Sequence, residues 1–193
     1  KKSERAYQML RRAIILNHYA PGTSLREQTL AAEFECSQST VREALLHLAD
    51  DGLVDRRGYQ GTMVTETTLA EAAAMVRVRL LIERDVARRI ARNGLGASED
   101  ALNALLAQMD HSNIEGDLVG AGEIDRAFHS ELAKAAGVEL VSPILQRCTL
   151  HIHRFTLGSV EVPREFFQES GVAAEHRKLL RALTTTDEAR AEA

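Results

Sequence analysis

The sequence predicts a mainly α-helical protein. Apolar residues make up 45% of its 193 residues, aromatic residues make up only 4%, Trp is absent and Pro occurs three times. Such a composition, rich in Ala and Leu, is typical of packed helices rather than of sheets. Because a chain of this length can bury two separate cores, we expect an N-terminal unit over residues 1–65 and an all-helical unit over residues 66–193.

Composition also indicates the compartment and the kind of partner. No stretch is long and apolar enough for a membrane span, and the first residues do not resemble a secretion signal, so we expect a cytoplasmic protein without a membrane partner. Cys36 and Cys148 are too few and too far apart for a disulfide framework or a thiolate zinc site. Residues 1–65 carry nine Lys/Arg against eight Asp/Glu, and the remainder fifteen against twenty. This asymmetry weakly favours the N-terminal unit as a DNA-binding unit.

Three helices are expected in the N-terminal unit. Apolar residues at helical spacing predict the first over residues 4–18, ended by the Pro-Gly pair that follows. A capping box at residues 24–27 predicts the start of a short second helix. After a three-residue turn, residues 38–50 form the third helix, with an apolar stripe against the core. Helix, turn and helix in this order are typical of a DNA-binding motif.

The third helix has the residues expected of a recognition helix. Short hydrogen-bonding side chains and one arginine occupy its outer, N-terminal part, which is the part that enters the major groove in helix-turn-helix proteins. These candidate DNA-binding residues are Ser37, which is also the expected N-cap, Gln38, Ser39, Thr40 and Arg42.

Two short strands follow, over residues 53–57 and 62–65, around a Gly-containing turn. A β-hairpin directly after a recognition helix is a wing, and polar wing residues can meet phosphates or the minor groove. The candidates here are Arg56, Arg57, Gln60 and Gly61. We therefore predict a winged helix-turn-helix with a small β-hairpin wing that binds double-stranded DNA.

Three segments of this unit carry a family resemblance. PGTSLREQTLAAEF, SQSTVREALLHLADDGLV and GYQGTMV resemble the DNA-binding domain of GntR-family transcription regulators. The family usually has Arg at the position of Gln38 and often has Pro at the position of Thr40. The resemblance implies sequence-specific DNA binding, but the base preference at these two positions does not carry over.

The second unit is predicted to be an antiparallel bundle of helices. A capping box at residues 68–71 begins a helix that runs to Asn93 and ends at a glycine. The same cap and proline patterns predict further helices over residues 98–113, 117–136, 142–158 and 171–183, and the start of a last one at residues 184–187.

Three polar side chains fall on the apolar faces of these helices. Asp125 and His129 are one turn apart on one face, and His176 lies in the middle of another apolar stripe. A divalent metal would satisfy all three. Spacing alone favours the alternative, in which Asp125 accepts a hydrogen bond from His129 and His176 is an ordinary core histidine.

A second resemblance bears on these alternatives. EIDRAFHSELAKAAG and EHRKLLRAL resemble the FCD effector domain of the FadR branch of the GntR family. The resemblance implies that Asp125, His129 and His176 bind a divalent transition metal such as Zn, Ni or Mn. It implies a fourth histidine slightly beyond Ala193, so that we expect a C-terminally truncated domain. It also implies a small carboxylic acid as effector.

Other polar residues are candidates for the effector pocket. Arg79 and Glu83 share the inner side of the first long helix, where Arg79 either pairs with Glu83 or binds a carboxylate ligand. His151 lies near the inner face of its helix, whereas His153 is expected to point away. We therefore take Arg79, Glu83 and His151 as candidate effector-binding residues.

Together these features predict a transcription regulator, such as a repressor, rather than an enzyme. We expect a homodimer on a palindromic operator, whose affinity changes when the effector shifts the two DNA-binding units. The alternative is a metal-dependent hydrolase fused to a DNA-binding module, since Asp and two His can activate water. No general base or nucleophile accompanies them in the sequence, so no catalytic residue is expected. A DNA-binding structural protein without a ligand is a third interpretation, but it does not explain the polar residues in the helical core.

Overall fold

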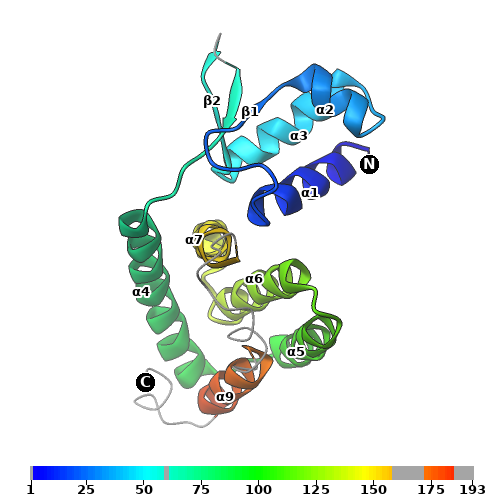
Figure 1. Ribbon diagram of the computed structural model, residues 1–193. Helices are drawn as coiled ribbons and strands as arrows, with labels where there is room; N and C mark the ends of the chain where they lie inside the picture. Colours follow the sequence, from blue (N-terminus) through cyan, green and yellow to red (C-terminus); the bar gives the residue numbers. More distant parts are fainter. Residues whose placement is uncertain (1, 59–60, 158–171, 185–193) are drawn as a thin grey trace.

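The computed structural model describes residues 2–58, 61–157 and 172–184. Within these residues the protein is mainly α-helical with one small antiparallel sheet, so the predicted fold class is confirmed. The N-terminal helices and the sheet lie at one end of the molecule, and the later helices gather at the other (Figure 1).

The N-terminal helices are α1 (Lys2–Ile15), α2 (Glu27–Glu33) and α3 (Gln38–Asp50). Helix α1 ends three residues earlier than predicted. Its end is set by Asn17, whose φ of 60° is left-handed, and by backbone hydrogen bonds that return to the last turn of the helix. Pro21, which comes later in the chain, is therefore not what ends the helix.

Helix α3 has the bounds that the sequence predicts. Ser37 is its N-cap, and the Ser37 side chain accepts a hydrogen bond from the backbone N–H of Thr40. The predicted apolar stripe is buried, and consists of Val41, Ala44, Leu45 and Leu48. This stripe leaves the opposite face of α3 exposed.

The sheet contains three strands, β1 (Ser24–Leu25), β2 (Val54–Arg56) and β3 (Thr62–Val64), in the order β1-β3-β2. Strands β2 and β3 form the predicted hairpin. The predicted capping box at residues 24–27 is wrong, because Ser24 pairs with Met63 in the ladder and has no role as a helix cap. Pairing with β3 holds this segment extended, so α2 begins only at Glu27.

The later helices follow the predicted order, and the capping box at the start of α4 is present with both of its hydrogen bonds. Their bounds are α4 (Leu69–Asn93), α5 (Ser98–Glu115), α6 (Leu118–Ala135), the 3₁₀ turn η2 (Glu139–Val141), α7 (Ser142–Leu157) and α9 (Val172–Thr184). The expected helix end at residue 158, the start at residue 171 and nearly all of the last expected helix start, residues 184–187, lie outside the described residues.

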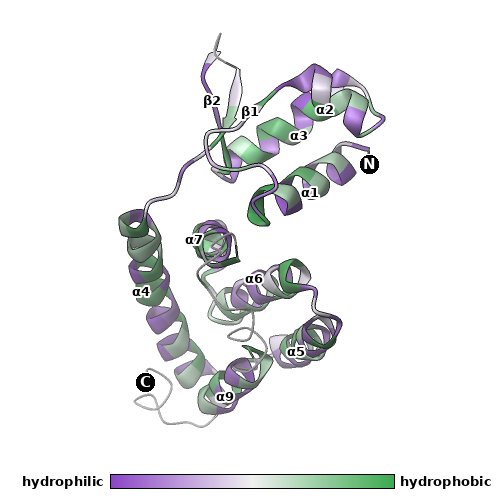
Figure 2. Cartoon of the chain, in the orientation of Figure 1, coloured by the Kyte–Doolittle hydropathy of each residue, from purple (hydrophilic) through white to green (hydrophobic). Residues whose placement is uncertain are grey.

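Every helix carries both hydrophobic and hydrophilic residues (Figure 2), as amphipathic helices around a core do. One core contains Leu10 and Leu45, and a second contains Phe128. Helix α7 contributes to both, since Leu150 belongs to the first core and Leu145 to the second. In Figure 1, α7 accordingly lies between the N-terminal elements and the helices α4 and α6. None of the described helices is both long and apolar enough to cross a membrane.

Candidate metal site and DNA-binding surface

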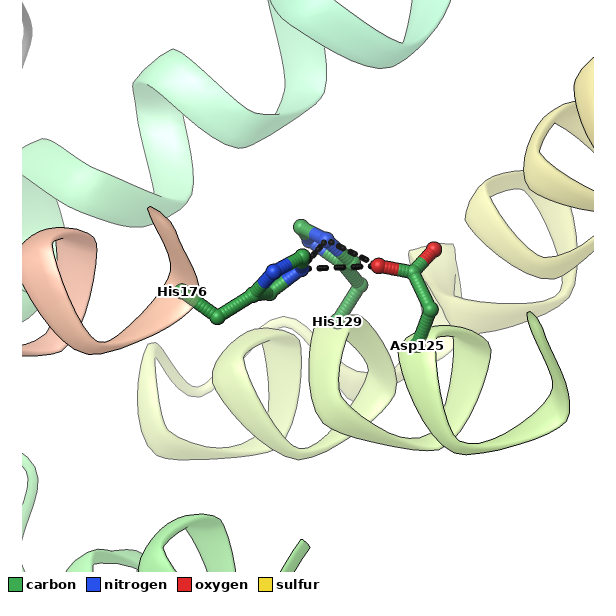
Figure 3. A group of neighbouring side chains, drawn as sticks. All are labelled: Asp125, His129 and His176. Atoms are coloured by element: carbon green, nitrogen blue, oxygen red, sulfur yellow. Dashed lines mark hydrogen bonds and ion pairs between the residues drawn. The ribbon is translucent and has the colours of Figure 1, made fainter. Parts of the chain in front are cut away.

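Asp125 and His129 project from α6 toward His176 of α9 (Figure 3). Asp125 Oδ1 lies 2.7 Å from His176 Nε2 and 3.4 Å from His129 Nε2, and the two imidazole nitrogens are 3.1 Å apart. The candidate ligand atoms of all three residues lie within 4.8 Å of one another. One carboxylate oxygen and two imidazole nitrogens form a donor set that suits a divalent transition metal. The structure therefore contains a possible Asp/His metal site.

Packing and hydrogen bonding orient the two imidazole rings. The ring of Phe128 is fully buried and meets both imidazoles edge-on, at centroid distances of 5.6 Å for His129 and 4.9 Å for His176. His176 Nδ1 is 2.7 Å from the backbone oxygen of Val172, which can only accept a hydrogen bond. His176 therefore carries a proton on Nδ1, and its Nε2 faces Asp125 and His129, where a bound metal would take the place of an N–H donor to the carboxylate.

Charges of both signs surround the buried carboxylate. Burial by itself raises the pKa of Asp125, but His129, His176 and Arg79 outweigh burial and hold that pKa well below its usual value. Burial lowers the pKa of His129, but Asp125 and Glu83 outweigh it, so the net direction is upward. Asp125 is therefore a carboxylate at neutral pH, as a metal ligand must be.

Arg79 and Glu83 of α4 border this cluster. The Arg79 Nε donates to Glu83 Oε1 at 2.7 Å, and Arg79 Nη2 lies 2.5 Å from His129 Nε2. Glu83 Oε1 is also 2.7 Å from His129 Nδ1. The two roles weighed for Arg79 are therefore compatible, because the guanidinium pairs with Glu83 and still faces the cluster.

A cavity of about 160 Å³ adjoins the cluster. Glu83, Arg84 and His129 are its polar lining residues, and the other lining side chains, from α4, α6, α7 and α9, are apolar. Among these are Leu80, Leu132, Leu145 and Leu179. The arrangement offers room for a small ligand beside the imidazole of His129.

The expected positions of two histidines on α7 are wrong. His151 does not line the cavity, because its Nε2 lies 3.0 Å from the backbone oxygen of Asp51 in the N-terminal unit. His153 does not point away, because its Nε2 lies 3.4 Å from Asp125 Oδ2. Helix α7 packs against other elements on more than one side. Its apolar stripe therefore marks one buried face, and other faces of the helix are buried as well. Gly122, a glycine inside α6, is the sequence feature that goes with the inward position of His153. A Cβ at Gly122 would lie 2.7 Å from His153 Nδ1.

Most of the predicted DNA-binding residues of α3 are on the surface. Ser37, Gln38 and Ser39 are exposed, and Thr40 is half-buried with its hydroxyl 2.8 Å from that of Ser37. Arg42 is exposed and pairs with Glu27 at the start of α2, where Arg42 Nη2 lies 2.6 Å from Glu27 Oε2. The exposed face of α3 therefore presents polar groups, with its arginine held by a carboxylate.

The wing also presents arginines to solvent. Arg56 and Arg57 are exposed, and Arg57 pairs with Asp55 at 2.7 Å. Gly61 is exposed with a φ of 82°, a conformation that favours glycine, and the expected residue Gln60 lies outside the described residues. Sequence reasoning missed Arg26, which lines a surface groove with Arg56. The expected capping box put Arg26 inside the first turn of the helix, whereas it is the N-cap of a helix that begins two residues later than expected.

A winged helix-turn-helix joined to a helical bundle defines a DNA-binding transcription regulator. The family described as "Bacterial regulatory proteins, gntR family" matches residues 2–64, and the FCD domain family matches residues 74–193. The chain therefore belongs to the GntR family and carries an FCD domain. Both predicted resemblances are confirmed.

Two relatives agree with this assignment, and a solved structure has a similar fold. The chain is 30% identical over 152 residues to the HTH-type transcriptional repressor RspR of Escherichia coli (strain K12), covering 79% of this chain and 67% of that protein. It is 30% identical over 182 residues to the gluconate operon transcriptional repressor of Bacillus subtilis (strain 168), covering 93% and 74%. The fold is similar to that of E. coli McbR/YncC, with a TM-score of 0.75 at 18% identity over 100% of this chain and 90% of the other.

These families contain transcription regulators, so the protein is a DNA-binding regulator and not an enzyme. The hydrolase alternative receives no support from the comparisons.

Proposed function

We propose that this regulator binds a divalent metal through Asp125, His129 and His176, and that a small carboxylic acid binding at the metal changes its affinity for operator DNA. The observation that carries this proposal is the convergence of three ligand atoms within 4.8 Å of one another at a largely buried site. One carboxylate oxygen and two imidazole nitrogens held this close together need either shared protons or a cation between them. A divalent metal would supply that cation.

The donor set fits Zn, Ni or Mn, with two nitrogens and one oxygen from the chain. A metal here would act as a Lewis acid that accepts the carboxylate of the effector. Arg79 and Glu83 border the site, and Arg79 supplies a guanidinium for an acid group. The cavity next to His129 would accommodate the remainder of the acid. His151 is not part of this pocket and instead contacts the N-terminal unit.

We further propose a homodimeric repressor that acts in the cytoplasm on a palindromic operator. The DNA-binding domain would comprise residues 1–65 and the effector domain residues 66–193. Two relatives are named as repressors, which supports this direction of regulation. A dimer of winged helices matches a two-fold operator.

DNA contact is proposed for the exposed N-terminal part of α3 and for the wing. These residues are Ser37, Gln38, Ser39, Thr40, Arg42, Arg56, Arg57, Gln60 and Gly61, and we add Arg26. The α3 side chains are of the types that read base edges, and the arginines of the wing are of the type that contacts phosphates.

Metal titration tests the proposal directly. Purified protein, freed of metal by chelation, is titrated with Zn²⁺, Ni²⁺ and Mn²⁺ in a calorimeter. We expect about one ion per chain, with binding lost in His129→Ala and His176→Ala. The matched control is His111→Ala, which removes a histidine whose side chain is 72% exposed on α5. Equal binding by all variants, or none by the unaltered protein, would contradict the metal site.

A second experiment tests whether binding of the acid changes operator affinity. A thermal-shift screen of small organic acids on the metal-loaded protein identifies a ligand, and an operator is selected from random duplex DNA. We expect the acid to change operator affinity in the unaltered protein and not in Arg79→Met. An acid that binds without changing operator affinity would contradict the coupling.

A further inference from the structure

The ring of His153 lies closely against α6, the helix that carries Asp125 and His129. Gly122 makes this approach possible, because a Cβ at that position would lie 2.7 Å from His153 Nδ1. Glycine is unfavourable inside a helix relative to alanine, so its presence in α6 needs a local reason. The reason here is the space that the imidazole of His153 occupies.

The two oxygens of Asp125 have different surroundings. Oδ1 faces His129 and His176, as Figure 3 shows, whereas Oδ2 is directed away from both. Two side chains face Oδ2: His153, with Nε2 at 3.4 Å, and Arg79, with Nη1 at 3.7 Å. Oδ2 has no hydrogen-bond partner among the described residues, although Asp125 is only 4% exposed. A donor is therefore missing on the side opposite the candidate metal.

Arg79 is the less favoured of the two donors, because its Nη1 is farther from Oδ2 than Nε2 of His153 is. The other nitrogens of its guanidinium, Nε and Nη2, already contact Glu83 and His129. His153 has no such competing side-chain contact among the described residues, and its Nε2 is the nitrogen that faces Oδ2. A neutral imidazole can hold its proton on Nε2 and donate it to a carboxylate.

Helix α7, which carries His153, also contacts the N-terminal unit. Arg154, the neighbour of His153, donates from Nη1 to Thr65 Oγ1 at 2.7 Å and from Nη2 to the Thr65 backbone oxygen. One helical turn earlier, Leu150 belongs to the N-terminal core, and His151 contacts the backbone oxygen of Asp51. Any shift of α7 must therefore change its contacts with the DNA-binding unit.

We propose that His153 positions the Asp125 carboxylate by donating from Nε2 to Oδ2, and that α7 thereby links the metal site to the DNA-binding unit. The inference rests on the proposed function, since it assumes that Asp125 is a metal ligand. Partners that hold a ligating side chain commonly affect metal affinity without touching the metal. His153 is a positioning residue in this sense.

Two substitutions separate hydrogen bonding from packing. His153→Leu removes the donor at similar size, and His153→Gln keeps an N–H near the position of Nε2. In a Zn²⁺ titration we expect His153→Leu to bind about 10- to 100-fold more weakly, and His153→Gln to bind nearly as tightly as the unaltered protein. His111→Leu on α5 is the control for loss of an exposed histidine, and circular dichroism without metal checks that each variant is folded.

The outcomes distinguish this inference from the proposed function. If the unaltered protein binds none of Zn²⁺, Ni²⁺ and Mn²⁺, both proposals fail. If it binds Zn²⁺ and the Leu variant binds equally well, only the role of His153 is overturned. Equal weakening in the Leu and Gln variants would also overturn it, because the shape of the ring and not its donor would then matter.

Hydrogen exchange tests the link through α7. In the unaltered protein we expect Zn²⁺ to slow exchange of the amides of Gly52, Leu53 and Thr65, which lie at the contact with α7. At Zn²⁺ concentrations that saturate His153→Leu, we expect this slowing to be lost. Slowing retained in the variant, or absent from the unaltered protein, would overturn the link through α7.

Discussion

Arg42 of the recognition helix α3 is held by Glu27 of α2, with both Nε and Nη2 of the guanidinium on the carboxylate. This contact lowers the pKa of Glu27, because the hydrogen bond from Arg42 favours its charged form. Glu27 therefore stays ionised, and in the proposed DNA-binding mode it places a negative charge beside the phosphates. We expect the pair both to orient Arg42 and to oppose non-specific binding to DNA.

Glu27→Gln tests the repulsive part of this role. We expect affinity for non-operator DNA to rise several-fold at low salt, and the salt dependence to steepen by about one unit in log–log slope. Discrimination between operator and non-operator DNA should fall. Fluorescence anisotropy over a salt series measures both, with Glu99→Gln on the exposed face of α5 as the control. Unchanged affinity and slope would contradict this view of Glu27.

Arg42→Ala removes the proposed base-reading side chain. Because Arg42 is exposed, the variant should remain folded and lose about 5- to 100-fold in operator affinity. Non-operator binding should fall much less. Anisotropy with both DNAs, together with thermal unfolding, checks the result, and full operator affinity at physiological salt would refute the role.

Removal of the metal should destabilise the protein. At a Zn²⁺ concentration of about 100 times Kd, binding adds roughly 2.7 kcal/mol to the free energy of unfolding, which corresponds to a rise in Tm of about 5–10 °C for a chain of this size. A chelator should reverse the rise. His176→Ala should show neither effect, whereas an equal rise in that variant would indicate binding elsewhere.

Phe128→Leu should weaken both the core and the metal site. Phe128 is fully buried, so we expect a loss of about 1–2 kcal/mol in the free energy of unfolding. The imidazoles of His129 and His176 also lose the ring that packs edge-on against them, and Zn²⁺ affinity should fall. Leu140→Ala, at a residue that is 96% exposed, is the control for both measurements. A Zn²⁺ affinity equal to that of the unaltered protein would mean that Phe128 does not orient the rings.

Arg154→Met should loosen the two units from each other. The Arg154 side chain is buried, and its loss leaves the Thr65 backbone oxygen without this donor. We expect a loss of about 1–3 kcal/mol in the free energy of unfolding and less cooperative unfolding of the two units. Denaturant unfolding followed by two probes measures this, with Arg181→Met on the surface of α9 as the control. Coincident transitions at unchanged stability would argue against the contact.

Local signals in the sequence determined most of the helices. Helix α3 and its cap at Ser37, and helix α4 with its capping box at Thr68, have the predicted starts and ends. These features depend on residues within one or two turns of each other, through capping hydrogen bonds and an apolar stripe. The placement of Asp125, His129 and His176 on buried faces follows from the same periodicity.

Tertiary structure decided what local signals could not. The segment at Ser24 is a strand because a partner strand pairs with it, and that pairing overrides a sequence that resembles a helix cap. Neither His151 nor His153 has its expected place, because α7 packs against α1 as well as against α4 and α6 and so has more than one inner face. Periodicity along one helix says which side chains share a face, but only packing against the other elements says what each face meets.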